Sequence, residues 1–192
     1  KAFELHKTKN FKIVHCRSYI SALVGMDMKE KLGVKFVFDM RGFYADERLD
    51  GGIWKLSNPV YRLVYDYFKQ KEKEFLSAAD YTVTLTQKAK DIIHRWNDIS
   101  GQPVPIQVVP CCADLELFSQ KSVDKALLEQ LRQKFKLSGN EFVLSYLGSV
   151  GTWYMLDEML DFFKCLLQSK PDAWFLFITG DNPVELRGKG KS

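Results

Sequence analysis

The feature that most constrains the fold is an alternation of short apolar runs with longer segments of helical periodicity. Runs of strand length are found at Phe11–His15, Val34–Phe38, Tyr81–Leu85, Ile106–Val109, Phe142–Leu147 and Ala173–Ile178. Helical patterns lie between or beside them, at Ser18–Leu32, Pro59–Ala79, Thr86–Trp96, Ser122–Lys136 and Thr152–Leu167. This alternation predicts an α/β fold, with Rossmann-like parallel sheets and helical crossovers.

Several helix ends carry local signals. Ser18 is predicted to cap a helix that Gly33 ends, and Pro59 suits the first turn of the next long helix. Thr152 is predicted to cap the last helix. The segment Asp39–Asn58 is polar and contains glycine, so we expect a loop there.

The segment Pro110–Ser119 is predicted to connect two domains. We expect a partial N-terminal domain over residues 1–118 and the start of a C-terminal domain over residues 119–192. An open alternative is a flavodoxin-like protein, with one continuous sheet and no hinge at the connector. Ligands of parallel sheets bind beyond the carboxyl ends of the strands. The loops of interest are therefore Cys16–Ser18, Asp39–Asp50, Pro110–Phe118, Gly148–Thr152 and Thr179–Pro183.

The composition excludes several classes of protein. The net charge of +4, from 28 basic and 24 acidic residues, is too small to indicate a nucleic-acid-binding protein. No apolar run approaches the length of a membrane span. The four cysteines form no C-x-x-C pair, which argues against a zinc site or a disulfide framework. Reduced thiols in a cytosolic protein are the simplest interpretation.

A glycine turn, Gly148-Ser149-Val150-Gly151, separates the strand at Phe142–Leu147 from the helix that follows. A strand, a glycine turn and a helix together can form an anion site, because free backbone N–H groups and the helix dipole point into the crevice. Glycine also lets a phosphate approach without a Cβ in the way. The turn is neither a full G-x-G-x-x-G nor a Walker A loop, and an ordinary tight turn is the alternative.

Arg41 follows a predicted strand, and its guanidinium group could bind an acidic or phosphorylated ligand in a bidentate manner. The alternative is an ion pair with Asp39, Asp46 or Glu47 that fixes the loop. Arg17 allows the same two interpretations. Asp46 and Glu47 could orient the hydroxyl groups of a ligand, or they could be solvated side chains at a loop tip.

Other side chains carry weaker indications. His15, at a strand end, is predicted to be a core histidine or one that supports a neighbouring site residue. Loop aromatics could stack on a sugar or a base, or make ordinary packing contacts; these are Phe43, Tyr44, Trp54, Trp153 and Tyr154. Alternating charges predict a solvated helix face at Lys69, Lys71, Glu72, Lys73 and Glu74. The sequence shows no Ser–His–Asp set and no metal-ligand set.

Four segments stand in a specific order and spacing: Asp39–Glu47, Ala79–Thr86, Ile106–Phe118 and Tyr146–Ser149. Together they resemble the GT-B glycosyltransferases of family 4. In that family the third segment usually reads like I-x-V-I-P-N-G-V-D-x-x-x-F and marks the passage between two Rossmann-like domains. Here it reads I-Q-V-V-P-C-C-A-D-L-E-L-F, with Cys111-Cys112 in place of the common Asn-Gly.

The resemblance implies retaining transfer of a sugar from an activated donor, usually a nucleotide sugar, to an acceptor. It implies that the acceptor binds to the N-terminal domain and the donor to the C-terminal domain, without a catalytic metal or another cofactor. A retaining transfer depends on stabilising the leaving group. Electrostatic donors at the donor phosphate are therefore the expected catalytic feature.

The chain departs from the family pattern at several positions. The family's glycine-rich first loop and its E-x7-E donor motif are not found. We therefore expect a middle portion of a glycosyltransferase, cut at both ends and weak or inactive alone. Ser149 and the Thr152–Tyr154 region stand where the family has the arginine and lysine of a diphosphate clamp. Arg17 stands where the family often has the second histidine of H-x-H.

The resemblance predicts a glycosyltransferase of cell-surface polysaccharide or glycoconjugate synthesis. The alternative is a noncatalytic, truncated module that binds a nucleotide or a partner. We expect acceptor contacts from Arg17, Asp39, Arg41 and Glu47, and donor-phosphate contacts from Gly148, Ser149, Gly151 and Thr152. The expected partners are a nucleotide-sugar donor and a glycan or lipid-linked acceptor, with no nucleic acid. The expected location is the cytoplasm, and peripheral membrane association of the full-length protein is left open.

Overall fold

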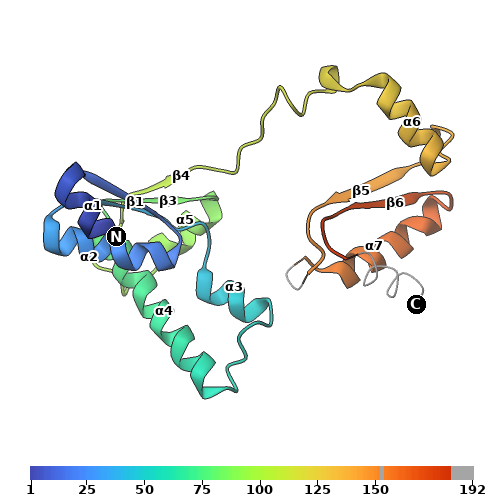
Figure 1. Cartoon of the computed structure of the whole chain (residues 1–192). Coiled ribbons are helices and arrows are strands. Elements are labelled where there is room, and N and C mark those ends of the chain that lie inside the picture. Colours follow the sequence, from blue (N-terminus) through green and yellow to red (C-terminus); the bar gives the residue numbers. More distant parts are fainter. Residues whose placement is uncertain (152–153, 183–192) are drawn as a thin grey trace. The chain divides into compact units, whose positions relative to one another are not determined.

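The computed structural model describes residues 1–151 and 154–182, and the chain divides into two compact units. The N-terminal unit is Lys1–Cys112 and the C-terminal unit is Ala113–Ser192, so the division falls within the predicted connector. Each unit has its own parallel sheet (Figure 1). The predicted α/β class with parallel strands is therefore confirmed, and the alternative of one continuous sheet is wrong.

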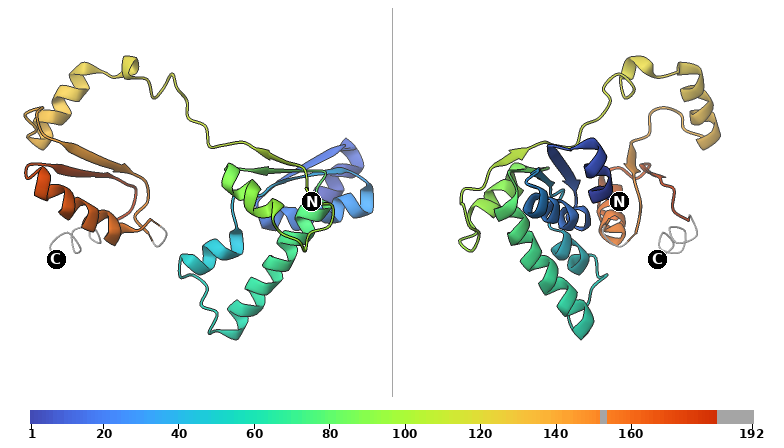
Figure 2. Two further views of the ribbon diagram at one scale, coloured as in Figure 1. Left: turned by 180° about the vertical axis from the view of Figure 1, so that it is seen from behind. Right: turned by 60° about the vertical axis from the view of Figure 1, so that its left-hand side comes forward.

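The N-terminal unit is a four-stranded parallel sheet whose strand order, β1-β2-β3-β4, is also the order along the chain. Its elements are α1 (Ala2–Lys9), β1 (Ile13–Arg17), α2 (Tyr19–Leu32), β2 (Lys35–Asp39), α3 (Tyr44–Asp50), α4 (Pro59–Ala78), β3 (Tyr81–Thr84), α5 (Gln87–His94) and β4 (Ile106–Val108). Because every step along the sheet runs in one direction, right-handed crossovers place their helices on a single face. Helices α2, α4 and α5 do lie on one side of the sheet (Figures 1 and 2).

The core of this unit fills the space between the sheet and those helices. The inward side chains of adjacent strands pair in register, Val14 with Phe36 and Cys16 with Phe38, and three of these four are buried. Tyr19 at the start of α2 is fully buried and makes aromatic contacts with residues of β2, α3 and α4, namely Phe38, Tyr44, Phe68 and Phe75.

The C-terminal unit contains a two-stranded parallel sheet. Its elements are a 3₁₀ turn η1 (Gln120–Ser122), α6 (Lys125–Phe135), β5 (Val143–Leu147), α7 (Leu156–Ser169) and β6 (Trp174–Ile178). Phe175 of β6 contacts Phe163 of α7 with ring centroids 5.1 Å apart. Among the described residues, no helix is both long and apolar enough to cross a membrane.

Local signals explain where most helices begin. The Asn58 side chain accepts a hydrogen bond from the Val60 amide, and Pro59 occupies the first turn of α4. The Thr86 hydroxyl accepts from the Ala89 amide at the start of α5. Gly33 ends α2 with φ +67°, a backbone conformation that glycine adopts without strain. These predicted boundaries are confirmed within a residue or two.

Two predicted caps and one predicted loop need correction. Ser18 precedes α2, but its side chain makes no capping hydrogen bond, because its backbone has φ +70°. Helix α7 begins at Leu156 after Met155, so the predicted cap by Thr152 is wrong; Thr152 itself lies outside the described residues. The predicted loop Asp39–Asn58 contains helix α3.

Candidate functional site

The carboxyl edge of the N-terminal sheet is built by backbone hydrogen bonds that continue past the strand ends. The Ser18 amide donates to the Asp39 carbonyl at 2.8 Å, and the Met40 amide donates to the Val83 carbonyl at 3.0 Å. The loops that follow β1, β2 and β3 are thereby held side by side. This edge carries Arg17, Asp39 and Arg41, which are three of the four residues predicted for the acceptor side.

Arg41 lies at the centre of a tight turn, Met40–Gly42, which we call the arginine turn. The Gly42 amide donates to the Met40 carbonyl at 2.7 Å, and Arg41 has φ +66°. A positive φ is uncommon for a residue with a side chain, and such positions cluster at functional sites. The Arg41 side chain is exposed and forms no ion pair with any residue in the described part of the chain.

The carboxylates that could have paired with Arg41 have other neighbours. Asp39 lies at the register position facing Arg17, and its Oδ2 is 3.5 Å from the Nε2 of His15, whose side chain is 61% exposed. The prediction of a core histidine at position 15 is therefore wrong. The other interpretation, a histidine that supports a neighbouring site residue, stays a prediction, with Asp39 as the neighbour that His15 contacts. Asp46 accepts hydrogen bonds from Tyr65 and Lys69 of α4.

Glu47 lies directly against the arginine turn. A Cβ atom built on Gly42 would be 2.0 Å from Glu47 Oε1, so the Glu47 carboxylate would have to shift if residue 42 carried a side chain. Glu47 itself is in the first turn of α3, where its charge is favourable to the helix dipole. The structure thus places Glu47 beside the arginine turn.

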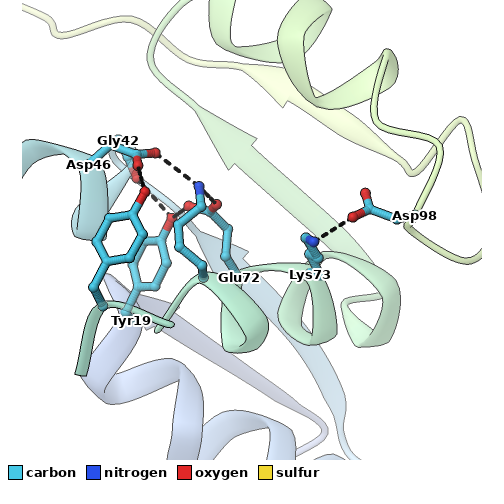
Figure 3. Close-up of polar contacts among 8 residues, drawn as sticks. Tyr19, Gly42, Asp46, Glu72, Lys73 and Asp98 are labelled. Atoms are coloured by element: carbon cyan, nitrogen blue, oxygen red, sulfur yellow. Dashed lines mark hydrogen bonds and ion pairs between the residues drawn. The ribbon is translucent and has the colours of Figure 1, made fainter. Parts of the chain in front are cut away.

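Tyr19, Asp46, Tyr65, Lys69 and Glu72 form a polar cluster that contacts the arginine turn at Gly42 (Figure 3). We call it the buried polar cluster because Tyr19 and Glu72 are fully buried. The Tyr19 hydroxyl donates a hydrogen bond to the Glu72 carboxylate. The Gly42 carbonyl, 3.2 Å from the same hydroxyl, is a second acceptor. Lys69 Nζ donates to Glu72 at 2.5 Å and to Asp46 at 2.9 Å. The Tyr65 hydroxyl donates to Asp46 at 2.7 Å. The cluster therefore joins α2, α3 and α4 to the turn.

Burial and pairing perturb the titration of this cluster. Burial raises the pKa of Glu72, although the hydrogen bonds from Lys69 and Tyr19 oppose the shift. Burial lowers the pKa of Lys69, but hydrogen bonds to Glu72 and Asp46 outweigh it, and the net pKa is raised. The hydrogen bond to Asp46 raises the pKa of Tyr65 to about 12. Lys69 and Tyr65 thus stay protonated at neutral pH.

The predicted solvated helix face is wrong at Lys69, Lys71 and Glu72. Glu72 is fully buried, and the side chains of Lys69 and Lys71 are 24% and 22% exposed. The apolar positions of α4 provide a signal that could have revealed this, because Phe68, Glu72 and Phe75 recur at helical spacing on one face. A charged residue on that face must find partners.

The loop aromatics of the N-terminal unit take part in packing. Tyr44 stacks on Tyr19 at 5.3 Å, and Trp54 stacks on Phe68 at 6.2 Å. Phe43 contacts Trp96 at 5.8 Å. Of the other two predicted stacking residues, Tyr154 is exposed and Trp153 lies outside the described residues.

The glycine turn follows β5 in the C-terminal unit. The Gly148 amide donates to the Ile178 carbonyl at 3.1 Å, and the Tyr146 hydroxyl donates to the Ser149 carbonyl at 2.7 Å. A Cβ on Gly148 would lie 2.9 Å from that hydroxyl oxygen, so glycine is needed there. The structure brings together Gly148, Ser149 and Gly151 of the predicted donor residues; the fourth, Thr152, lies outside the described residues.

The donor groups of the glycine turn face an acidic side chain. Asp181, in the loop after β6, accepts hydrogen bonds through Oδ2 from the Ser149 hydroxyl at 2.5 Å and from the Val150 amide at 2.6 Å. Across residues 1–151 and 154–182, no group of three or more histidine, cysteine, aspartate or glutamate side chains is placed to hold a metal ion.

Comparison with known proteins places the chain in a family. The model of Glycosyltransferase Family 4 matches residues 1–117, more than half of the chain. The solved sucrose-phosphate synthase from Thermosynechococcus elongatus matches with a TM-score of 0.59 at 15% sequence identity. The match covers 94% of this chain but 40% of that chain. A search of curated protein sequences found no match. The structural similarity identifies the GT-B fold, and the match over residues 1–117 shows that the chain belongs to Glycosyltransferase Family 4.

Proposed function

We propose that this chain takes part in the retaining transfer of a sugar from a nucleotide-sugar donor to a glycan or lipid-linked acceptor. The process would be the synthesis of a cell-surface polysaccharide or glycoconjugate. The observation that carries the proposal is the family match over residues 1–117. The exposed arginine on the carboxyl edge of that same region supports it, because ligands of parallel sheets bind at this edge.

On the acceptor side, Arg41 supplies the positive charge. Its guanidinium group has no ion-pair partner among the described residues, so its fork is available for a phosphate or carboxylate of the acceptor. Asp39 and Glu47 would accept hydrogen bonds from acceptor hydroxyl groups, and Arg17 would add a second charge at the edge. The buried polar cluster would hold the arginine turn in position for this contact.

On the donor side, we assign the phosphate to Gly148, Ser149, Gly151 and Thr152, within a domain that begins after residue 118. The amide groups and hydroxyls would stabilise negative charge that develops on the leaving phosphate, which is the main electrostatic requirement of the transfer. We place the protein in the cytoplasm, and a lipid-linked acceptor would bring the full-length protein to the membrane surface.

The test is a transfer assay with a panel of nucleotide sugars and lipid-linked acceptors. It uses both the 192-residue chain and the natural gene product that contains it. We expect transfer by the natural product and little by the chain alone, since the chain spans 40% of the synthase that it matches. Nucleotide binding without transfer by the natural product would instead support a noncatalytic binding module.

The Arg41→Ala substitution tests the acceptor side. Loss of a charge-assisted contact is worth about 1.5 to 3 kcal/mol, so kcat/KM for an acidic acceptor should fall about 10- to 100-fold. Arg41→Lys should recover only part of the activity, because an ammonium group lacks the bidentate fork. The exposed Arg95, which ends α5, supplies the control Arg95→Ala. Unchanged kcat/KM in Arg41→Ala would remove Arg41 from the acceptor site.

A further inference from the structure

The loop after β6 places a carboxylate on the glycine turn. One oxygen of Asp181 accepts both the Ser149 hydroxyl at 2.5 Å and the Val150 amide at 2.6 Å. The Asp181 amide donates in turn to the Thr179 hydroxyl at 3.1 Å, which fixes the conformation of the loop. Two loops that lie about thirty residues apart in the sequence are thus joined by a single carboxylate oxygen.

The two groups that bind Asp181 are the kind that bind a phosphate. A hydroxyl and a backbone amide at the end of a parallel strand are typical anion ligands in α/β proteins. These same hydrogen bonds keep the pKa of the Asp181 carboxyl below its usual value. The side chain is therefore a negatively charged carboxylate at neutral pH. An anion made by the chain itself already occupies these two donors.

We propose that Asp181 determines the specificity of the glycine turn, as an internal anion that a donor phosphate must displace from the Ser149 hydroxyl and the Val150 amide. This inference rests on the proposed donor site. A free phosphate has to compete with a tethered carboxylate and meets its negative charge. A nucleotide sugar has further contacts that compensate for both. The turn therefore discriminates against small free anions and favours release of the phosphate-bearing product.

The geometry also predicts what happens when the charge is removed. Asp181→Asn keeps an oxygen that can accept from Ser149 and Val150, but it removes the negative charge. Inorganic pyrophosphate contains the diphosphate group of a nucleotide sugar and no other part of it. It should bind to the variant about tenfold more tightly than to the natural chain, since like charges a few ångströms apart repel even in water. Asp172→Asn, in the exposed turn before β6, removes the same charge elsewhere and should leave binding unchanged.

The experiment is a titration of the 192-residue chain with inorganic pyrophosphate, in which the NMR chemical shift of the Val150 amide monitors binding. The expected result is a lower Kd and a larger Val150 shift in Asp181→Asn than in the natural chain or in Asp172→Asn. Asp181→Ser, which keeps a hydroxyl acceptor, provides a second uncharged variant if the asparagine variant does not fold. Equal or weaker binding in the uncharged variants would overturn the proposal.

A further outcome separates this inference from the proposed function. If pyrophosphate leaves the Val150 amide unmoved in every variant, the internal-anion proposal is wrong, because removing the charge has not opened the turn. Sugar transfer by the natural gene product is measured independently of this titration. The proposed function therefore stands or falls on the transfer assay, whatever the result at Val150.

Discussion

Replacing Lys69 by methionine should lower the free energy of unfolding, because it leaves a carboxylate of the buried polar cluster without its cation. Lys69 is the one cation among the cluster residues Tyr19, Asp46, Tyr65, Lys69 and Glu72, and it neutralises Glu72, which is fully buried. Methionine keeps much of the aliphatic length of the lysine side chain and removes the Nζ cation, which also lies 5.1 Å from the centre of the Trp96 ring. Glu72 would then keep the Tyr19 hydroxyl as its remaining cluster partner.

The expected loss is about 3 kcal/mol of the free energy of unfolding near pH 8. Removing one partner of a buried ion pair costs about 3 to 5 kcal/mol, and we take the lower end because Lys69 is 24% exposed. With a urea dependence of about 2 kcal/mol per molar, the midpoint of unfolding should fall by about 1.5 M. Urea unfolding followed by circular dichroism measures this shift.

The same loss should depend on pH in a defined direction. Burial raises the pKa of Glu72 in the folded chain, and Lys69 opposes that shift. Without Lys69 the folded pKa rises further above the unfolded value, which is about 4.3. A raised folded pKa means that protonation favours the folded state. The loss of stability caused by Lys69→Met should thus be smaller at pH 5 than at pH 8. This loss should increase as the pH rises through the pKa of Glu72 in the folded chain.

Two controls make the test specific. Lys71→Met removes a neighbouring cation that is about as exposed as Lys69, but its partner Glu74 is 36% exposed and stays hydrated without it, so the cost should be less than about 1 kcal/mol. Adding Glu72→Gln to Lys69→Met removes the unpaired charge and should recover part of the stability. A loss below about 1 kcal/mol, or one that is equal at both pH values, would refute the idea that Lys69 neutralises a buried carboxylate.

Two further predictions concern the packing and the charge of the N-terminal unit. Gly25→Ala should lower the Tm by about 10 °C, because overpacking costs about 2 kcal/mol and the new Cβ would lie 2.4 Å from Cys16 Sγ and 2.8 Å from the Phe36 ring. An unchanged Tm in calorimetry would contradict this and would show that α2 and the sheet can shift apart at little cost. Hydrogen bonds from Lys29 and the Phe36 amide outweigh the effect of burial and lower the pKa of Asp80, so this carboxylate contributes stability that is lost as the pH falls below about 4. Asp80→Asn should reduce stability at pH 7 by about 2 kcal/mol and flatten the acid side of the stability profile; an equally steep profile in urea titrations would contradict this.

Periodicity predicted the order of the strands and helices well, because each signal lies within one element. It failed for α3, which depends on contacts far along the chain: Tyr44 packs on Tyr19, and Ala45 is buried. The alternating charges of α4 favoured a solvated face, yet they did not show that Glu72 shares a face with Phe68 and Phe75. The helical spacing of the apolar residues was the better guide.

For the candidate site, topology was predictable and side-chain pairing was not. Parallel strands bring their carboxyl ends to one edge, so the gathering of Arg17, Asp39 and Arg41 follows from the strand order. The positive φ of Arg41 is a property of the folded turn and has no signature in the sequence. Likewise, the loops after β5 and β6 were expected to lie together, but the bond from Ser149 to Asp181 depends on loop conformation.

The separation of the chain into two sheets has a consequence for its biosynthesis. Within residues 1–151 and 154–182, all strand pairs form between strands of the same unit, with β1 to β4 in Lys1–Cys112 and β5 with β6 in Ala113–Ser192. All four strands of the first sheet have therefore been synthesised before the first strand of the second sheet is made. Domains generally fold as units, the N-terminal one first during synthesis. The carboxyl edge of the first sheet, with its arginine turn, is thus expected to be complete while the residues of the glycine turn are still being translated.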